Sequence, residues 1–176
     1  MPRKIISYIA TSINNKIARK DGDVAWLEEI PNPENSDYGY SAFYETIDTT
    51  IQGFSTYALV KSWNVPFPYP TKKNFVVTRK SSLDPDENVE FITADHIEFI
   101  RNLKAAEGKD IWLIGGGQLN TMFLNAGLLD EMIVFVMPII IPDGIDLFEG
   151  HPNQTSLKLK SSKGHSSGVI ETHYTV

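Results

Sequence analysis

The run Gly115–Gly116–Gly117 in the segment "IWLIGGGQLN" is the first candidate for chemistry in this sequence. It joins an apolar, strand-like segment to a helix-like one. Glycine has no Cβ atom, so phosphate oxygens can approach the backbone, and the N–H groups at a helix start attract an anion. A P-loop is excluded because no Lys-Ser or Lys-Thr follows, and a dinucleotide fingerprint is weakened because Asn120 occupies its third glycine position. The glycines therefore either form a tight turn or bind a phosphate.

Composition excludes several classes of protein. The 176 residues predict a single domain (1–176) with a sizeable core, and 41% apolar and 22% charged residues are typical of a globular protein. A net charge of −6 argues against nucleic acid as a partner. There is no cysteine and no close histidine pair, so we expect no metal site. Without a signal peptide or an apolar run long enough for a membrane span, the sequence predicts a cytoplasmic protein.

The elements that must hold the glycines alternate between strands and helices. Strands are predicted at 4–11, 49–53, 74–80, 89–93, 111–114 and 131–141, and helices at 36–48, 54–63, 96–107 and 118–127. Ser36 and Asp95 are candidate N-caps, and Gly108 is a candidate residue after a helix end. The segments 156–163 and 169–176 predict a C-terminal hairpin. This order indicates an α/β fold with a mostly parallel sheet and an antiparallel end.

Five segments in this order resemble the dihydrofolate-reductase-like superfamily, and most closely the reductase domain of bacterial riboflavin biosynthesis. They are "ISYIATSINNKIA", "TIQGFSTYALV", "NFVVTRK", "IWLIGGGQLNTMFLNAGLLDEM" and "LLDEMIVFVMPIIIPDGIDLF", which together span nearly the whole chain. The most specific element is I-G-G-G-x-L followed by L-x-D-E. The resemblance implies a three-layer dihydrofolate-reductase-like fold and an NADPH cofactor across the ends of the sheet strands.

The resemblance also implies three cofactor segments. The glycine segment would contact the pyrophosphate and nicotinamide, and its Gly115–Gly116 peptide bond would be cis. A second segment would bind phosphate where a helix follows a strand, and a third would receive the adenosine 2′-phosphate, for which a cationic pair is suited. The alternative for the third segment is an exposed basic strand end. The residues are Gly115, Gly116, Gly117, Gln118 and Leu119; Gly53, Ser55 and Thr56; and Thr78, Arg79 and Lys80, with Ala10 beside the cofactor.

This sequence departs from the family pattern at one cofactor position. The second segment usually reads G-R-x-T, with the arginine as a phosphate ligand, whereas Phe54 stands at that position here. Arg79 and Lys80 would then carry more of the 2′-phosphate recognition, so the preference for NADPH over NADH is open. The first turn reads S-I-N-N instead of S-L-D-G, which the backbone tolerates equally well.

For catalysis the resemblance implies an acidic residue on the first helix, buried so that its pKa is raised and it can hold a proton. Asp37 is the candidate, ahead of Glu45 and Asp48, although an acidic residue in a first helical turn also simply favours the helix dipole. Ile17, Trp26 and Tyr40 are candidate substrate contacts, and core packing is the alternative for Trp26.

The predicted function is an NADPH-dependent reductase that transfers a hydride to a small pterin-like or pyrimidine-like heterocycle. The alternatives are an NADP(H)-binding protein without turnover, either a sensor or a degenerate homologue, and an unrelated phosphate-binding α/β domain. Relatives of the riboflavin type are commonly dimers, so we expect a homodimer, to which the apolar strand Met132–Ile141 could contribute.

Overall fold

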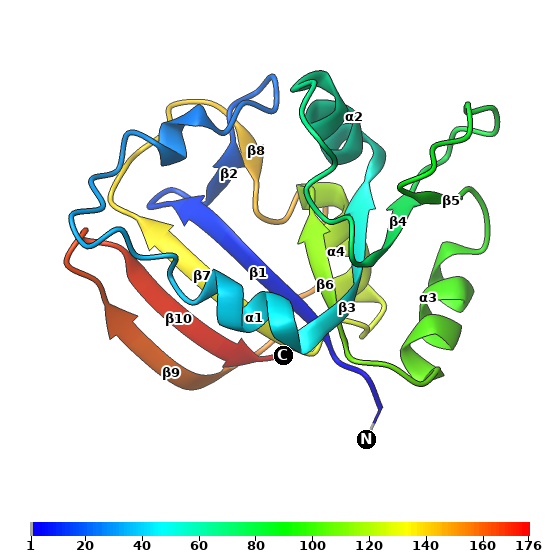
Figure 1. Cartoon of the computed structure of the whole chain (residues 1–176). Helices are drawn as coiled ribbons and strands as arrows, with labels where there is room; N and C mark the ends of the chain where they lie inside the picture. Colours follow the sequence, from blue (N-terminus) through cyan, green and yellow to red (C-terminus); the bar gives the residue numbers. More distant parts are fainter. Residues whose placement is uncertain (1) are drawn as a thin grey trace.

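A computed structural model describes residues 2–176 and consists of one large mixed sheet with helices on both faces (Figure 1). The eight strands follow the order β5-β4-β3-β6-β1-β7-β10-β9, and β2 and β8 form a separate two-stranded sheet. The pairs from β5 to β7 are parallel, whereas β10 is antiparallel to both of its neighbours. The predicted α/β fold, mostly parallel with an antiparallel end, is confirmed. The strands are β1 (Ile5–Ser12), β2 (Lys16–Ala18), β3 (Ile47–Gly53), β4 (Lys73–Val77), β5 (Glu90–Ile92), β6 (Asp110–Gly115), β7 (Glu131–Met137), β8 (Ile145–Asp146), β9 (Lys158–Gly164) and β10 (Ile170–Thr175).

The helices divide the apolar side chains of the sheet into separate core clusters. Helices α3 and α4 pack on one face, where Ile100 and Phe123 join Ile51 and Leu113 of the sheet. Helix α1 packs on the other face, where Phe43 contacts the Trp112 cluster. The helical segments are η1 (Ala25–Leu27, a 3-10 helix), α1 (Tyr40–Thr46), α2 (Phe54–Ser62), α3 (His96–Ala105) and α4 (Gly117–Asn125). None of them, within residues 2–176, is long and apolar enough to cross a membrane.

The parallel strands β1, β3, β4 and β6 end at the same edge of the sheet, at the top of Figure 1. Helix α2 begins directly after β3, and α4 begins one residue after β6. In open α/β sheets, ligands bind at the carboxyl ends of the strands. This edge therefore carries the segments that the sequence singled out.

Several boundary predictions were wrong. The first helix was expected from Ser36, but α1 begins at Tyr40 after Gly39 in a left-handed conformation (φ 83°). Helix α3 ends at Ala105, three residues before Gly108. Its start was predicted correctly, because Asp95 stands at the N-cap position, but Asp95 has φ 48° and makes no side-chain cap hydrogen bond.

The strand predicted at 131–141 ends at Met137, because Pro138 cannot donate to the strand pairing. This strand, β7, lies between β1 and β10 in the interior of the sheet. Five of its seven residues are buried, so packing within the chain accounts for most of its apolar side chains. Of the residues after it, Ile140 is exposed and Ile141 is buried.

Candidate functional site

Two strand-to-helix junctions adjoin each other at the carboxyl ends of β3 and β6. Gln52 of β3 pairs in register with Gly115 of β6. The Thr56 hydroxyl on α2 donates to the Gly115 carbonyl oxygen over 3.4 Å. A Cβ atom added to Gly53 would lie 3.7 Å from the same oxygen. The structure thus brings together two residues, Thr56 and Gly115, that are 59 positions apart and that the sequence had assigned to one cofactor.

The bend between β6 and α4 depends on two successive glycines with positive φ. Gly115 has φ +103° and Gly116 has φ +41°, where an L-residue is strained. A Cβ atom on Gly116 would find its nearest neighbour, the Thr56 hydroxyl, at 3.5 Å, so the backbone is accessible from the side of α2. The expected cis bond between Gly115 and Gly116 is wrong: the bond is trans, and the positive φ values make the turn instead.

The third glycine faces the other way and packs against the segment 142–149. A Cβ atom on Gly117 would lie 2.2 Å from the Asp146 carbonyl oxygen. The Glu149 N–H donates to the Gly117 carbonyl over 3.2 Å, and the Asn120 side-chain amide donates to the Leu147 carbonyl over 2.8 Å. Gly117 is therefore required by close packing beneath the junction, and it does not face α2.

The basic segment after β4 reaches toward the start of α2. Thr78 is buried, and its hydroxyl accepts a hydrogen bond from the Lys80 N–H at 3.1 Å. The Lys80 ammonium lies 3.8 Å from the centre of the Phe54 ring, on the first residue of α2. Arg79 and Lys80 are both exposed. Of the two, Lys80 is the residue whose ammonium lies against the first residue of α2, beside the β3–α2 junction.

An aromatic cluster lies on the α1 face of the sheet. The Tyr8 ring stacks on Phe43 at 4.6 Å, and Tyr40 packs edge-on to Trp112 at 5.8 Å. The Trp112 indole N–H donates to the Tyr8 carbonyl over 3.2 Å. Burial, and then the charge of Asp37, raise the pKa of Tyr8, so its hydroxyl stays neutral and donates to the Tyr38 carbonyl. Tyr40 is half-buried in this cluster.

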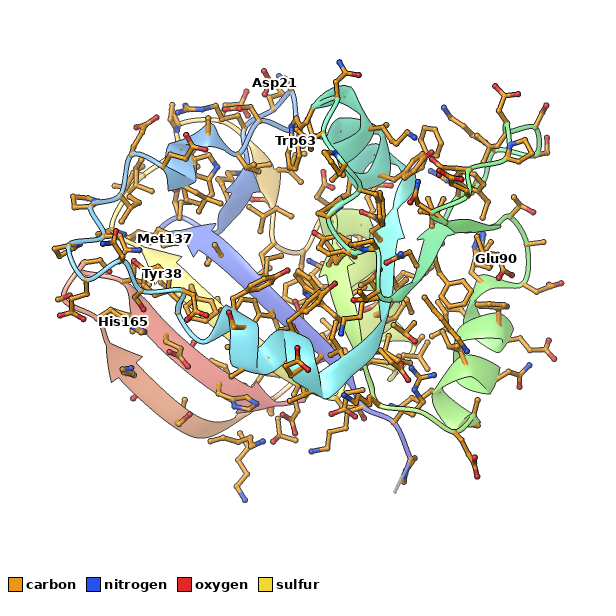
Figure 2. All side chains as sticks on the ribbon, viewed as in Figure 1. Asp21, Tyr38, Trp63, Glu90, Met137 and His165 are labelled. Carbon is orange, nitrogen blue, oxygen red and sulfur yellow. The ribbon has the colours of Figure 1, made fainter. Side chains whose placement is uncertain are left out.

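The segment before α1 also contacts the β9–β10 turn. The Tyr38 ring packs edge-on to His165 at 4.9 Å, and its hydroxyl donates to the Ser167 hydroxyl over 3.0 Å. Figure 2 shows Tyr38 and His165 close together, with Met137 near them. The C-terminal hairpin therefore holds the chain at the residue that directly follows Asp37.

Asp37 lies near Tyr8 but is not buried. Its two carboxylate oxygens accept hydrogen bonds from the Gly39 N–H at 2.9 Å and the Ser41 N–H at 3.0 Å. Hydrogen bonds from Ser41 and then from Gly39 lower the pKa of Asp37. The expected burial and raised pKa are wrong, because the loop before α1 turns this carboxylate toward the first N–H groups of the helix.

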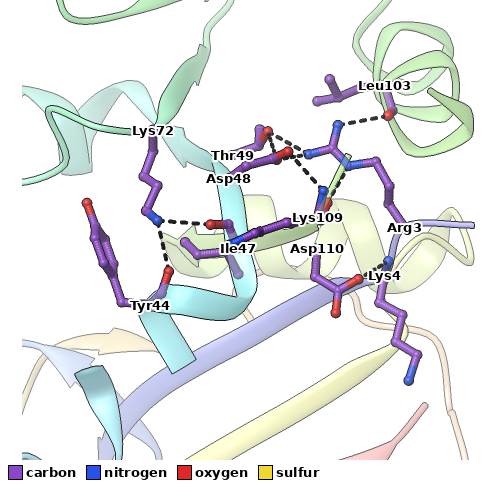
Figure 3. A network of polar contacts seen from close by, with 10 residues as sticks. All are labelled: Arg3, Lys4, Tyr44, Ile47, Asp48, Thr49, Lys72, Leu103, Lys109 and Asp110. Atoms are coloured by element: carbon purple, nitrogen blue, oxygen red, sulfur yellow. Dashed lines mark hydrogen bonds and ion pairs between the residues drawn. The ribbon is translucent and has the colours of Figure 1, made fainter. Parts of the chain in front are cut away.

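The two other acidic candidates do not replace it. Asp48 lies at the amino end of β3 and pairs with Arg3, far from the glycine junctions (Figure 3). Figure 3 also shows Lys72, which donates to the carbonyls of Tyr44 and Ile47. Glu45 is exposed on α1.

The remaining predicted residues divide between the sheet edge and the core. Trp26 is fully buried beside Phe135 and Met137, so the core alternative holds for it. Ile17 packs against the main core, and Leu119 is a member of that core, which leaves only its backbone near the junction. Three residues stay at the edge: Ala10 is half-buried on β1, and Ser55 and Gln118 are exposed in the first turns of α2 and α4.

Two polar residues at the junctions were missed. In the sequence, Asn120 counted only as a residue that is not the third glycine of a dinucleotide fingerprint. In the structure its side chain packs against Gly115, because its side-chain oxygen would lie 2.9 Å from a Cβ atom added there. Gln52 is fully buried, and neither atom of its side-chain amide has a hydrogen-bond partner within residues 2–176. For Gln52, a polar residue directly before Gly53 was the available signal.

A cavity of about 510 Å³ lies away from the glycine junctions, between the end of α2, the proline-rich segment 64–70 and residues 87–88.

The sequence of this chain matches a known protein family. The model of the RibD C-terminal domain matches residues 3–170 of this chain. The chain belongs to the RibD C-terminal domain family. This result confirms the resemblance that the sequence motifs carried.

Three individual proteins show how similar the chain is to known sequences and structures. Protein YwjB of Bacillus subtilis (strain 168), described as uncharacterized, is 40% identical over 174 residues, which cover 99% of this chain and 98% of that one. A crystal structure from Shewanella sp. PV-4, provisionally assigned to riboflavin biosynthesis, is 30% identical with a TM-score of 0.86, covering 99% and 98% of the two chains. Dihydrofolate reductase from Enterococcus faecalis, solved with NADP(H), is 13% identical with a TM-score of 0.68, covering 98% and 96%. The last similarity shows the fold alone.

Proposed function

We propose that this protein is an NADPH-dependent reductase that transfers a hydride to a small pterin-like or pyrimidine-like heterocycle. The observation that carries the proposal is the contact of the two glycine junctions, with the Thr56 hydroxyl against the Gly115 carbonyl. A reductase-type role on a heterocyclic substrate agrees with the family and its neighbours. NADPH, cytoplasmic location and action as a single domain 1–176 are parts of the proposal.

The residues at the junctions fit a dinucleotide phosphate. Gly116 has no atom closer than 3.5 Å to the position of an added Cβ, so its backbone can approach a ligand closely. Helices α2 and α4 both begin beside it, and neither has a side-chain cap or an acidic residue in its first turn. Their free N–H groups and dipoles favour an anion. Phosphate would be held at the start of α2 by Gly53, Ser55 and Thr56. It would be held at the start of α4 by Gly115, Gly116 and the backbone from Gly117 to Leu119. The 2′-phosphate would be held by Thr78, Arg79 and Lys80.

NADPH would supply the hydride, so the chain has to position the reacting rings and exclude water. Ala10 at the end of β1 has a small side chain, which leaves room for a flat ring. We place the heterocycle between Ala10 and Tyr40, with Ile17 and Trp26 supporting this region from the core. The aromatic cluster behind Tyr40 holds it rigidly, which favours a defined substrate orientation.

Asp37 enters the proposal as an ionised carboxylate. Its lowered pKa prevents it from donating a proton near neutrality, but a carboxylate beside the substrate can accept hydrogen bonds from ring N–H groups. Because Asp37 is already engaged with Gly39 and Ser41, a binding protein without turnover is the second candidate function.

The test is NADPH binding followed by turnover. NADPH affinity is measured by fluorescence, and NADPH oxidation is then measured with dihydrofolate and with 5-amino-6-ribosylaminopyrimidinedione phosphate. Asp37→Asn, which keeps the size of the side chain, is compared with the wild type. Oxidation with one substrate supports the reductase, and tight binding without oxidation of either supports the binding protein. If NADPH does not bind, both candidates are wrong.

We also propose a homodimer that uses the surface of β9 and β10. All seven residues of β9 are exposed, and Leu159 and Ile170 are 52% and 47% exposed, respectively. The lysines at 158, 160 and 163 oppose pairing of the strand edge itself, so the face is the better surface. Sedimentation equilibrium of the wild type and of Leu159→Asp tests this: a monomeric wild type contradicts it.

A further inference from the structure

Phe54 stands where the pattern that this sequence resembles usually has an arginine, and in this structure a cation from the segment after β4 lies over its ring. The Lys80 ammonium lies 3.8 Å from the ring centre. That distance is well within the range of an attractive cation–π contact. The positive charge lost at position 54 is thereby restored nearby, from the end of β4.

The backbone directs Lys80 to this place. The Thr78 hydroxyl accepts from the Lys80 N–H at 3.1 Å, and the Thr78 carbonyl is bound by a His96 ring nitrogen at 3.0 Å. Thr78 itself is buried. The turn after β4 is therefore fixed on both sides of Arg79, and Lys80 leaves it toward α2.

The charge of Lys80 is not compensated by the protein. No carboxylate of residues 2–176 forms an ion pair with it. The ammonium lies beside the first residue of α2, at the positive end of the helix dipole, and the first turn contains no acidic residue. A cation at that end is unfavourable unless an anion joins it. The carboxylate of Asp86 already accepts a hydrogen bond from the Tyr57 hydroxyl of α2 and pairs with Lys61.

We infer that Phe54 is a positioning residue that holds the Lys80 ammonium for the 2′-phosphate, so that Lys80 alone, and not Arg79, determines the preference for NADPH over NADH. The inference rests on the proposed function. It replaces the equal assignment of Arg79 and Lys80 with one residue and gives the half-buried Phe54 a role at the start of α2.

The test compares the dissociation constants of NADPH and NADH, measured by fluorescence titration, in matched variants. Lys80→Met should weaken NADPH roughly 10-fold or more and leave NADH unchanged, because a charge-assisted contact is lost. Lys73→Met, which removes an exposed lysine at the opposite end of β4, is the control and should change the NADPH/NADH ratio less than about twofold, and Arg79→Met should lower the ratio less than Lys80→Met does. Phe54→Leu should lower the ratio roughly two- to fivefold, and Phe54→Tyr, which keeps the ring face, should retain it.

A second measurement needs no cofactor. The methylene protons next to the Lys80 ammonium should show a ring-current shift in the NMR spectrum of the wild type and of Phe54→Tyr, which Phe54→Leu removes. The inference is overturned if Arg79→Met lowers the ratio as much as Lys80→Met, or if Phe54→Leu leaves both the ratio and the shift unchanged. If the wild type binds neither nucleotide while the shift is present, the proposed function fails and the Phe54–Lys80 geometry stands.

Discussion

The packing of Gly117 against the segment 142–149 yields a quantitative prediction. In Gly117→Ala, the new Cβ atom would lie 2.2 Å from the Asp146 carbonyl oxygen, whereas ordinary contacts begin at 3.4 Å. The carbonyl must therefore retreat by about 1.2 Å, the difference between these distances. It cannot do so freely, because Asp146 pairs with Lys16 in the β2–β8 sheet and the Leu147 N–H donates to the Asn15 carbonyl.

The cost follows from the contacts that this movement disturbs. The hydrogen bonds from Glu149 to Gly117 and from Asn120 to Leu147 would lengthen, and each contributes about 1 kcal/mol. Strain from overpacking adds about 1–3 kcal/mol, and the better helix propensity of alanine returns up to about 1 kcal/mol. We expect a net destabilisation of about 2–3 kcal/mol, equivalent to a Tm lower by roughly 4–12 °C for a chain of this size.

Urea unfolding, followed by circular dichroism, measures the change. Gly164→Ala, on the exposed strand β9, is the control. The new Cβ atom would lie 3.8 Å from the Ile170 side chain, which is an ordinary contact, so the substitution should alter stability by less than about 0.5 kcal/mol. The reasoning is refuted if the free energy of unfolding of Gly117→Ala lies within about 0.5 kcal/mol of the control. In that case the segment 142–149 does not close against α4 as described.

Three further predictions concern polar contacts away from the junctions. Burial tends to raise the pKa of Glu131, but hydrogen bonds from Lys4, Lys160 and His173 outweigh it and lower the pKa to about 2 from 4.5. This stabilisation is present above about pH 4.5 and is lost as pH falls toward 2, so the stabilities of the wild type and Glu131→Gln, measured by urea unfolding, should differ at pH 6 and converge near pH 2. Tyr57→Phe removes the hydroxyl that donates to Asp86 over 2.6 Å and should cost about 1 kcal/mol; no change in urea midpoint would contradict this. Asn74→Ala removes two N–H groups, which are shared among the carbonyls of Tyr69, Lys72 and Asn88, and the oxygen that accepts from the Thr50 hydroxyl, and should cost about 3 kcal/mol. A loss below about 1 kcal/mol would show that water replaces these bonds.

The sequence predicted the sheet well because its strands are continuous apolar runs buried on both faces. Such runs are readable without knowledge of their neighbours, and β1, β3, β4, β6 and β7 were all located. The short strands β2 and β8 were missed. The equally short β5 was located within the strand-favouring run VEFIT, whereas the sequences KIA and ID lie next to turn residues. Their pairing depends on contacts more than a hundred positions apart.

The site was predictable in its backbone and not in its side chains. Glycines and the order of the motifs indicated the two junctions, because a close backbone approach requires that residue type. The exposure of Asp37 depends on where α1 begins, and a left-handed Gly39 moved that start four residues beyond Ser36. The Phe54–Lys80 contact joins α2 to the end of β4, so only the folded chain reveals it.

The state of Asp37 also determines how turnover should respond to pH. Hydrogen bonds from Ser41 and Gly39 keep its pKa below the ordinary 3.8, so the carboxylate is ionised from pH 5 to pH 9. If Asp37 orients the substrate as a carboxylate, its titration contributes nothing to the rate of NADPH oxidation in that range, and the proton reaches the product from water. A buried acid with a raised pKa would instead give a rate that rises as pH falls through 6. Single-turnover rates at five pH values, repeated with Asp37→Asn, separate the two cases. A rise toward acid that Asp37→Asn abolishes would show that substrate binding buries Asp37 and breaks its contacts with α1.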